Sequence, residues 1–194
     1  MSMELMEAIR TRRSVRRYQD REVPRELLEE LMEAACWAPS ADNLQPWYFV
    51  VLTKPEDIAL LRETMEKVSE EIKPYLQEMF PRHPRVVAET AGFLRRLGGA
   101  PVYVLAFLQK DYGEHTRDAV LESTAAAIQN LHLAACERGL GTCWVNAATG
   151  LGYSPVLQEL FAPDKGEFVS LISVGWPDQK PRTPSRKPGR WEIR

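Results

Sequence analysis

Four short apolar runs, bounded by proline, glycine or charged residues, limit what this chain can fold into more than any other feature of its sequence. Their short length and their content of β-branched and aromatic side chains predict buried strands. The runs are WYFVVL at 47–52, PVYVLAFL at 101–108, GTCWV at 141–145 and FVSLISVG at 168–175. Helical patterns lie between and around them, so we expect an α/β sandwich of two or three layers.

The helical patterns around these runs differ in how they distribute apolar residues. A helix that begins at Pro24 presents one apolar stripe. Residues 117–139 are apolar almost all round, which predicts a buried helix whose alanines allow close packing. Residues 56–98 are highly charged and are interrupted at Pro74 and again at the sequence FPRHP. This block predicts two amphipathic helices that cover another part of the same domain.

Length, charge and cysteine content narrow the class of protein. The chain has 194 residues and a formal net charge of −2, so it can bury one core and has no overall attraction to nucleic acid or membrane. Cys36, Cys136 and Cys143 form neither a C-x-x-C motif nor an even framework, which indicates a reducing compartment and buried thiols. No signal or transit peptide is visible, and the longest apolar run is too short to span a bilayer. We expect a single soluble, cytoplasmic domain over 1–194.

Most familiar catalytic motifs are absent. His83, His115 and His132 lack metal-ligand spacing with one another or with the cysteines, so no metal site is expected. Cys143 lies in an apolar strand and is interpreted as a buried thiol, not a nucleophile. The glycine-containing sequences GGAP and ERGLGTCW match neither a dinucleotide-binding fingerprint nor a P-loop. These features argue against hydrolase or kinase chemistry, and we assign no catalytic side chain.

The sequence RTRRSVRRYQDR at 10–21 places six arginines in twelve positions. Arg12, Ser14 and Arg16 alternate, so on an extended segment their side chains point the same way. Two forked guanidinium donors beside a hydroxyl suit a phosphate monoester dianion. These residues alone support a solvated basic face or an RNA-binding patch as well as they support a phosphate site. A nucleic-acid site would need more nearby aromatic or basic groups than Tyr18, so no nucleic-acid partner is expected.

The end of the chain carries Pro177, Pro181, Pro184 and Pro188 among basic residues. Proline cannot continue a helix or pair within a central strand. Residues 177–194 are therefore expected to form an extended arm, although a disordered basic tail has the same composition.

Four sequence motifs, in their order along the chain, resemble those of the FMN-dependent nitroreductase family. They are RRSVRRY at 12–18, APSADNLQPWYFVV at 38–51, AAAIQNLHLAACERGLGTCWV at 125–145, and VGWP followed by SRKP near the C-terminus. Each motif alone is weak evidence, but their order and spacing are typical of the small single-domain members. The block 56–98 lies outside the resemblance.

The resemblance implies an α+β fold, a three-layer sandwich with a mostly antiparallel central sheet, assembled as an intertwined homodimer with FMN at the interface. Arg12, Ser14 and Arg16 would hold the FMN phosphate and ribityl chain, with Arg13 lending mainly its backbone. Arg186, in the SRKP sequence on the arm, would close on the same phosphate.

The resemblance also assigns two groups of residues to opposite sides of the flavin ring. They are Pro39, Ser40 and Asn43, and Trp144, Val145 and Asn146. Two positions depart from the family pattern. Many relatives have glycine at the position of Asn146, and Pro184 stands where the family has a lysine near the phosphate, with Lys187 as the nearby replacement.

The implied activity is that of an FMN-dependent NAD(P)H oxidoreductase that reduces nitroaromatic, quinone or related small-molecule acceptors by a ping-pong mechanism. NADH or NADPH would be the co-substrate, and the flavin would carry the chemistry. The block 56–98 would form a lid, where Tyr75 and Phe80 either shape acceptor choice or pack in the core. Three alternatives stay open: an FMN-dependent reductive dehalogenase or flavin-fragmenting enzyme, a non-catalytic flavin-binding redox module, and an RNA-binding domain.

Overall fold

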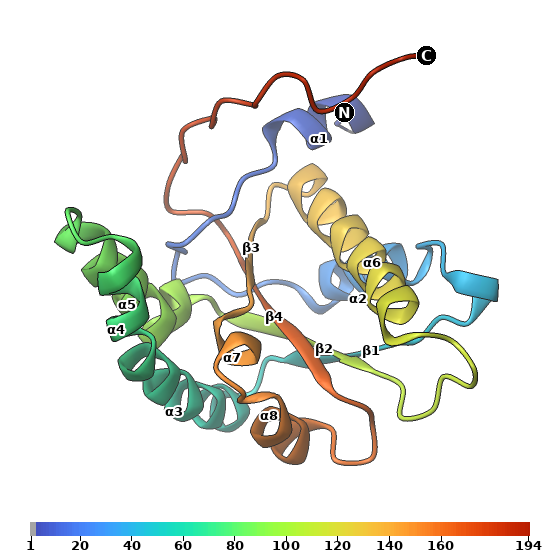
Figure 1. The fold of residues 1–194 in the computed structure, drawn as a ribbon, viewed down its shortest axis with the longest axis horizontal. Helices are drawn as coiled ribbons and strands as arrows, with labels where there is room; N and C mark the ends of the chain where they lie inside the picture. The colour runs from blue at the N-terminus through green and yellow to red at the C-terminus, as the bar shows by residue number, and fades with distance from the viewer. Residues whose placement is uncertain (1–2) are drawn as a thin grey trace.

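One antiparallel sheet of four strands forms the centre of the molecule (Figure 1). The structure, a computed structural model, describes residues 3–194. The strands are β1 (Trp47–Leu52), β2 (Val102–Leu108), β3 (Gly141–Val145) and β4 (Phe168–Gly175). They lie in the order β1-β2-β4-β3, and each neighbouring pair is antiparallel. The four expected strands are therefore confirmed.

Helices cover both faces of this sheet. Within residues 3–194 they are α1 (Leu5–Thr11), α2 (Arg25–Cys36), α3 (Pro55–Glu71), α4 (Lys73–Met79), α5 (Pro84–Arg96), α6 (Arg117–Glu137), α7 (Ala147–Gly150) and α8 (Ser154–Phe161). Helices α2 and α6 lie on one face, and α3, α7 and α8 lie on the other (Figure 1). The expected three-layer α+β sandwich is confirmed.

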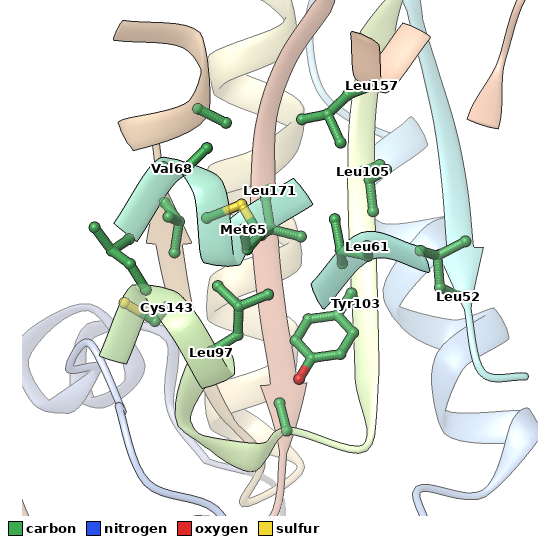
Figure 2. Packing of buried hydrophobic residues seen from close by; sticks show 14 of the residues in the cluster. Leu52, Leu61, Met65, Val68, Leu97, Tyr103, Leu105, Cys143, Leu157 and Leu171 are labelled. Atoms are coloured by element: carbon green, nitrogen blue, oxygen red, sulfur yellow. The ribbon is translucent and has the colours of Figure 1, made fainter. Parts of the chain in front are cut away.

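The core on the α3 side is built by alternate residues of the strands, because successive side chains of a strand point to opposite faces. Tyr103, Leu105 and Leu171 point to this side. There they meet Leu61 and Met65 of α3, as the close view shows (Figure 2). All five side chains are fully buried.

The core on the α6 side uses the intervening strand residues. Val104 and Ile172 pack here with Leu31 of α2 and with Ile128 and Leu131 of α6. Helix α6 is nevertheless buried along one face only, since residues such as Glu122 and Gln129 remain exposed. The sequence predicted that this helix is buried on nearly all sides, and the prediction was wrong for its outer face.

The block 56–98 contains three helices, where the sequence predicted two. Helix α3 ends at Glu71, and α4 begins at Lys73 with Pro74 in its first turn. Proline has no N–H to donate to the preceding turn, so one helix cannot run through this position, whereas a new helix can start there. The expectation that all three cysteines are buried was also wrong, because Cys36 is exposed and only Cys143 is fully buried.

The C-terminal arm begins by lying along the segment between α1 and α2. Gln19 N–H donates to the Trp176 carbonyl and Asp178 N–H donates to the Arg17 carbonyl, each at 2.9 Å. Farther on, the arm runs past α1 and forms no helix or strand over the residues described (Figure 1). Trp191 near its end is 81% exposed.

Candidate functional site

The arginine segment, residues 12–18, is bonded to the sheet at β3. Val15 N–H donates to the Thr142 carbonyl at 2.9 Å. Gly141 lies directly beneath Val15, and a Cβ at this glycine would come within 2.8 Å of the valine side chain. This close approach requires glycine, so the segment lies flush against β3.

Tyr18 provides a second, buried anchor for the segment. Its hydroxyl donates to the Val15 carbonyl at 2.6 Å and lies 2.8 Å from Ser173 Oγ in β4. Burial raises the pKa of Tyr18 far above its ordinary value, so the phenol stays protonated and can donate. Both backbone polar groups of Val15 are therefore satisfied inside the protein.

Two cavities open on either side of this segment. The α1 cavity, of about 440 Å³, lies between α1, β3 and the arm, and it is lined by Arg12, Arg13, Thr142 and Lys180 among others. The α5 cavity, of about 820 Å³, is lined by Arg16, Arg17, Phe93, Arg96, Gly98 and Gln179 among others. Arg12 and Arg16 thus line different cavities, with the buried Val15 between them, so the expectation that their side chains point the same way was wrong.

The α5 cavity brings the arginine segment against the end of the 56–98 block. The Arg16 guanidinium lies 5.8 Å from the centroid of the Phe93 ring, within range of a cation–π attraction. Arg96, the last residue of α5, adds a second positive charge to the same cavity. The sequence analysis missed Arg96; its only signal was an Arg-Arg pair immediately before Leu97 and the Gly98-Gly99 turn.

Gly98 makes this junction possible. Its φ is +70°, and a Cβ there would lie 2.5 Å from the Arg16 carbonyl oxygen. The Gly98 carbonyl in turn accepts from Tyr18 N–H at 3.3 Å. A residue with a side chain would both strain the backbone and displace Arg16.

The residues at the end of β3 lie on the same strand as the contact with Val15. Trp144 and Val145 are the last residues of β3, and the exposed Asn146 follows them directly before α7. The indole Nε1 of Trp144 is buried and has no acceptor among the described residues. Burial raises the pKa of the neighbouring Cys143 thiol, so this cysteine remains protonated and is a poor nucleophile.

The loop 40–45 has an unusual backbone. Asp42, Asn43 and Gln45 all have positive φ, at 46°, 56° and 49°, a region that residues other than glycine adopt at a cost in free energy. Ser40 Oγ accepts from Gln45 N–H at 2.9 Å and helps to hold the turn. A second contact places Asp42 Oδ2 3.0 Å from His115 Nε2.

This loop and the arginine segment do not meet within one chain. The segment 39–43 lies beyond α6, on the side opposite to the segment 12–16 (Figure 1). Ala41 N–H instead donates to Ser123 Oγ of α6 at 3.2 Å.

The arm brings a further set of residues to the arginine segment. Arg13 Nη2 donates to Thr183 Oγ1 at 2.7 Å. Arg17 is paired with Asp178, with 2.9 Å between Nε and Oδ2. Arg186 lies three residues beyond Thr183 and is exposed.

Comparisons with known proteins agree with this architecture. The family model for the nitroreductase family matches residues 9–176. The chain therefore belongs to the nitroreductase family. It is 30% identical over 187 residues to a Bacillus subtilis protein named as a candidate NAD(P)H nitroreductase, a match that covers 96% of this chain and 91% of the relative. It is 33% identical over 186 residues to a Methanothermobacter thermautotrophicus protein named as a candidate NADH dehydrogenase/NAD(P)H nitroreductase, covering 93% of this chain and 81% of the relative.

A solved structure gives the same result. The crystal structure of a candidate nitroreductase in complex with FMN, from Desulfovibrio desulfuricans, superposes with a TM-score of 0.71 at 28% identity. The match covers 97% of this chain and 94% of the other.

Residues 3–194 contain neither a candidate membrane span nor a candidate metal site. No helix there is long and apolar enough to cross a membrane. No group of three or more His, Cys, Asp or Glu side chains there is arranged to hold a metal ion.

Proposed function

We propose that this protein is an FMN-dependent NAD(P)H oxidoreductase that reduces nitroaromatic, quinone or related electrophilic acceptors. The observation that carries the proposal is the arginine segment, which is anchored by the buried Val15 and Tyr18 and presents cationic side chains to two cavities. When bound, FMN would supply the redox chemistry, an exchange of two electrons between NAD(P)H and the acceptor.

The donor set fits the phosphate of such a cofactor. Arg12, Ser14 and the backbone of Arg13 would bind the phosphate and ribityl chain on the α1 side, where Lys180 adds positive charge. Charge-assisted bonds to arginine are among the strongest that a phosphate can make. Arg186, on the arm that already contacts Arg13 through Thr183, would complete this set.

The α5 cavity fits a ligand that gains electrons. Arg16 and Arg96 place two positive charges beside it, and nearby positive charge stabilises negative charge that develops on a bound ring. The proposed flavin chemistry requires no side chain to act as an acid or base. Cys143 is held protonated by burial, so the residues bind and orient the cofactor without entering the chemistry.

A second copy of the chain would complete the site. The segment 39–43, which carries the proposed ring-lining residues, lies across α6 from the arginine segment (Figure 1), so a single chain would not bring both sets together. Exposed apolar residues on α1 and the arm, including Leu5, Met6 and Trp191, provide surface for an intertwined homodimer.

The helices of the 56–98 block would act as a lid. Helix α5 already lines the α5 cavity through Phe93 and Arg96. Tyr75 on α4 is exposed, so its packing in the core of the chain is excluded, and Phe80 lines a smaller depression between α4 and α5. In the proposed function these two aromatic side chains would lie on the lid, where an acceptor would arrive.

The proposal is tested on purified protein. We expect a yellow protein that releases FMN and not FAD on denaturation, and that oxidises NADH or NADPH when a quinone is added. Initial-rate plots at several acceptor concentrations should give parallel lines, as a ping-pong mechanism requires. Protein that contains only FAD, or that binds no flavin after incubation with excess FMN, would contradict the assignment. Bound FMN without NAD(P)H oxidation would indicate a flavin-binding module.

A further inference from the structure

A buried histidine lies beneath the arginine segment. His132, on α6, is 2% exposed in a helix face that is otherwise mostly apolar. Its Nδ1 atom lies 2.7 Å from Thr142 Oγ1 of β3. Its ring centroid is 5.7 Å from that of Trp144 on the same strand. A buried polar pair of this kind is costly to break, because either partner left alone loses its hydrogen bond without regaining water.

Thr142 is also the residue to which the arginine segment is attached. Its carbonyl accepts from Val15 N–H, and it forms an isolated β-bridge with Ser14. The side chain of Thr142 is thus bonded to α6, while its backbone is bonded to the segment that carries Arg12 and Ser14. One residue connects the helix to the proposed phosphate site.

Arg12 is near enough to influence the histidine. Burial, and after it the positive charge of Arg12, lowers the pKa of His132 to about 4. The imidazole is therefore neutral near pH 7. It can pair with the threonine hydroxyl without placing a second positive charge beneath the guanidinium.

We propose that His132 is a positioning residue for the phosphate of the flavin cofactor. Through its bond to Thr142 it fixes the distance of residues 12–15 from β3 and their alignment along that strand. It thereby fixes the placement of the Arg12 and Ser14 side chains. The inference rests on the proposed function, since it assumes that these side chains bind the FMN phosphate.

This role predicts an effect that depends on the phosphate. FMN and riboflavin share the ring and the ribityl chain, but only FMN carries the phosphate. A variant that shifts Arg12 and Ser14 should weaken binding of FMN far more than binding of riboflavin, because arginine makes its strongest, charge-assisted bonds to the phosphate. General loosening of the fold would weaken both ligands alike.

The test uses full-length apoprotein and measures dissociation constants for FMN and for riboflavin by quenching of flavin fluorescence. His132→Leu should raise the dissociation constant for FMN about tenfold, the size expected for weakening one charge-assisted contact to the phosphate, and that for riboflavin by about threefold at most, through the ribityl chain. His132→Asn, whose amide can reach Thr142 from nearly the position of Nδ1, should restore most of the FMN affinity. Thr53→Val, at an exposed threonine outside the site, is the matched control for Thr142→Val.

A double-mutant cycle isolates the pair. If the two residues act through their mutual bond, the His132→Leu/Thr142→Val protein should bind FMN no more weakly than either single variant. It also avoids leaving one buried polar group unpaired, so it serves if His132→Leu alone does not fold. Equal losses for FMN and riboflavin, additive losses in the cycle, or unchanged FMN affinity would each overturn the inference. Wild-type protein that binds neither flavin would instead overturn the proposed function itself, and this inference with it.

Discussion

The arginine segment and the loop 40–45 are both proposed to bind the flavin, yet they are held in place by different kinds of interaction. The arginine segment is held by groups inside the protein: Val15 is buried, and the Tyr18 hydroxyl bonds its carbonyl. The loop 40–45 is held mainly by side chains at the surface, such as Ser40 with Gln45 N–H, with one bond to the buried Ser123 of α6. It also carries three non-glycine residues at positive φ.

This difference predicts different local stabilities. Hydrogen bonds anchored in a core break only when the whole protein unfolds. Exposed hydrogen bonds around a strained turn break in local unfolding events. Each residue at positive φ costs about 1–3 kcal/mol, and an exposed hydrogen bond offsets about 1 kcal/mol of that. We therefore expect the phosphate side of the site to be preformed, and the ring side to become ordered when the flavin and a second chain are present.

The largest effect should come from Gly98, where α5 meets the arginine segment. Gly98→Ala forces a Cβ against the Arg16 carbonyl at positive φ, and we expect the free energy of unfolding to fall by about 3 kcal/mol. Urea denaturation measures this. Gly99→Ala is a matched control, because its φ is also positive but its surroundings are open, so it should cost only about 1 kcal/mol. Equal losses at both positions would show that the close approach does not hold the segment.

A nearly equal effect should appear as a pH dependence of stability. Burial, with a contribution from Arg12, lowers the pKa of His132 from 6.5 to about 4. Between these values the unfolded chain binds a proton that the folded chain excludes, so stability is full above about pH 6.5 and falls as the pH drops to about 4. The total loss attributable to this residue is about 3 kcal/mol. Urea titrations from pH 7 to pH 4 should show a shallower fall for His132→Asn than for the wild type.

Arg12→Ala tests the ligand-binding side of the arginine segment. Losing one charge-assisted contact costs about 1.5–3 kcal/mol, so the dissociation constant for FMN should rise about ten- to a hundredfold. Apoprotein titration with FMN measures the change. Arg10→Ala, at an exposed arginine of α1, should bind like wild type. An unchanged affinity for FMN in Arg12→Ala would show that the arginine cluster is a solvated surface and not a phosphate site.

The smallest and most local effect should come from the loop 40–45. Ser40→Ala removes the acceptor for Gln45 N–H, at a cost of about 1 kcal/mol or less. Hydrogen exchange should show faster exchange of the Gln45 amide and an unchanged Val15 amide in the same sample. If instead the melting temperature fell as far as in Gly98→Ala, the contrast between the two segments would be wrong.

Much of the fold could be predicted because its signals are local. Runs such as WYFVVL reveal their strands by composition alone, and Pro24 marks the beginning of α2. The short helices α7 and α8 carry no comparable pattern and went unnoticed. Helix α8 depends on packing of Leu157, which is fully buried under the sheet, and such tertiary support is invisible in a short sequence window.

The candidate site could be predicted only in part, for a related reason. The arginines between residues 10 and 21 are visible in the sequence as a cluster, and the resemblance to nitroreductases assigns them to the FMN phosphate. Arg96 and His132 approach that cluster from elements far along the chain, so only the folded structure shows them. His132 in particular lies in a helix whose apolar pattern suggested nothing beyond core packing.

The contact between Gly98 and Arg16 has a mechanical consequence. Because the turn at the end of α5 rests on the backbone of the arginine segment, α5 cannot tilt as a rigid body without pushing on Arg16. If the helices of the 56–98 block act as the proposed lid, their motion would therefore change the geometry of the proposed cofactor site. By thermodynamic reciprocity, an acceptor that shifts α5 must change the affinity for flavin by the same factor by which flavin changes the affinity for that acceptor.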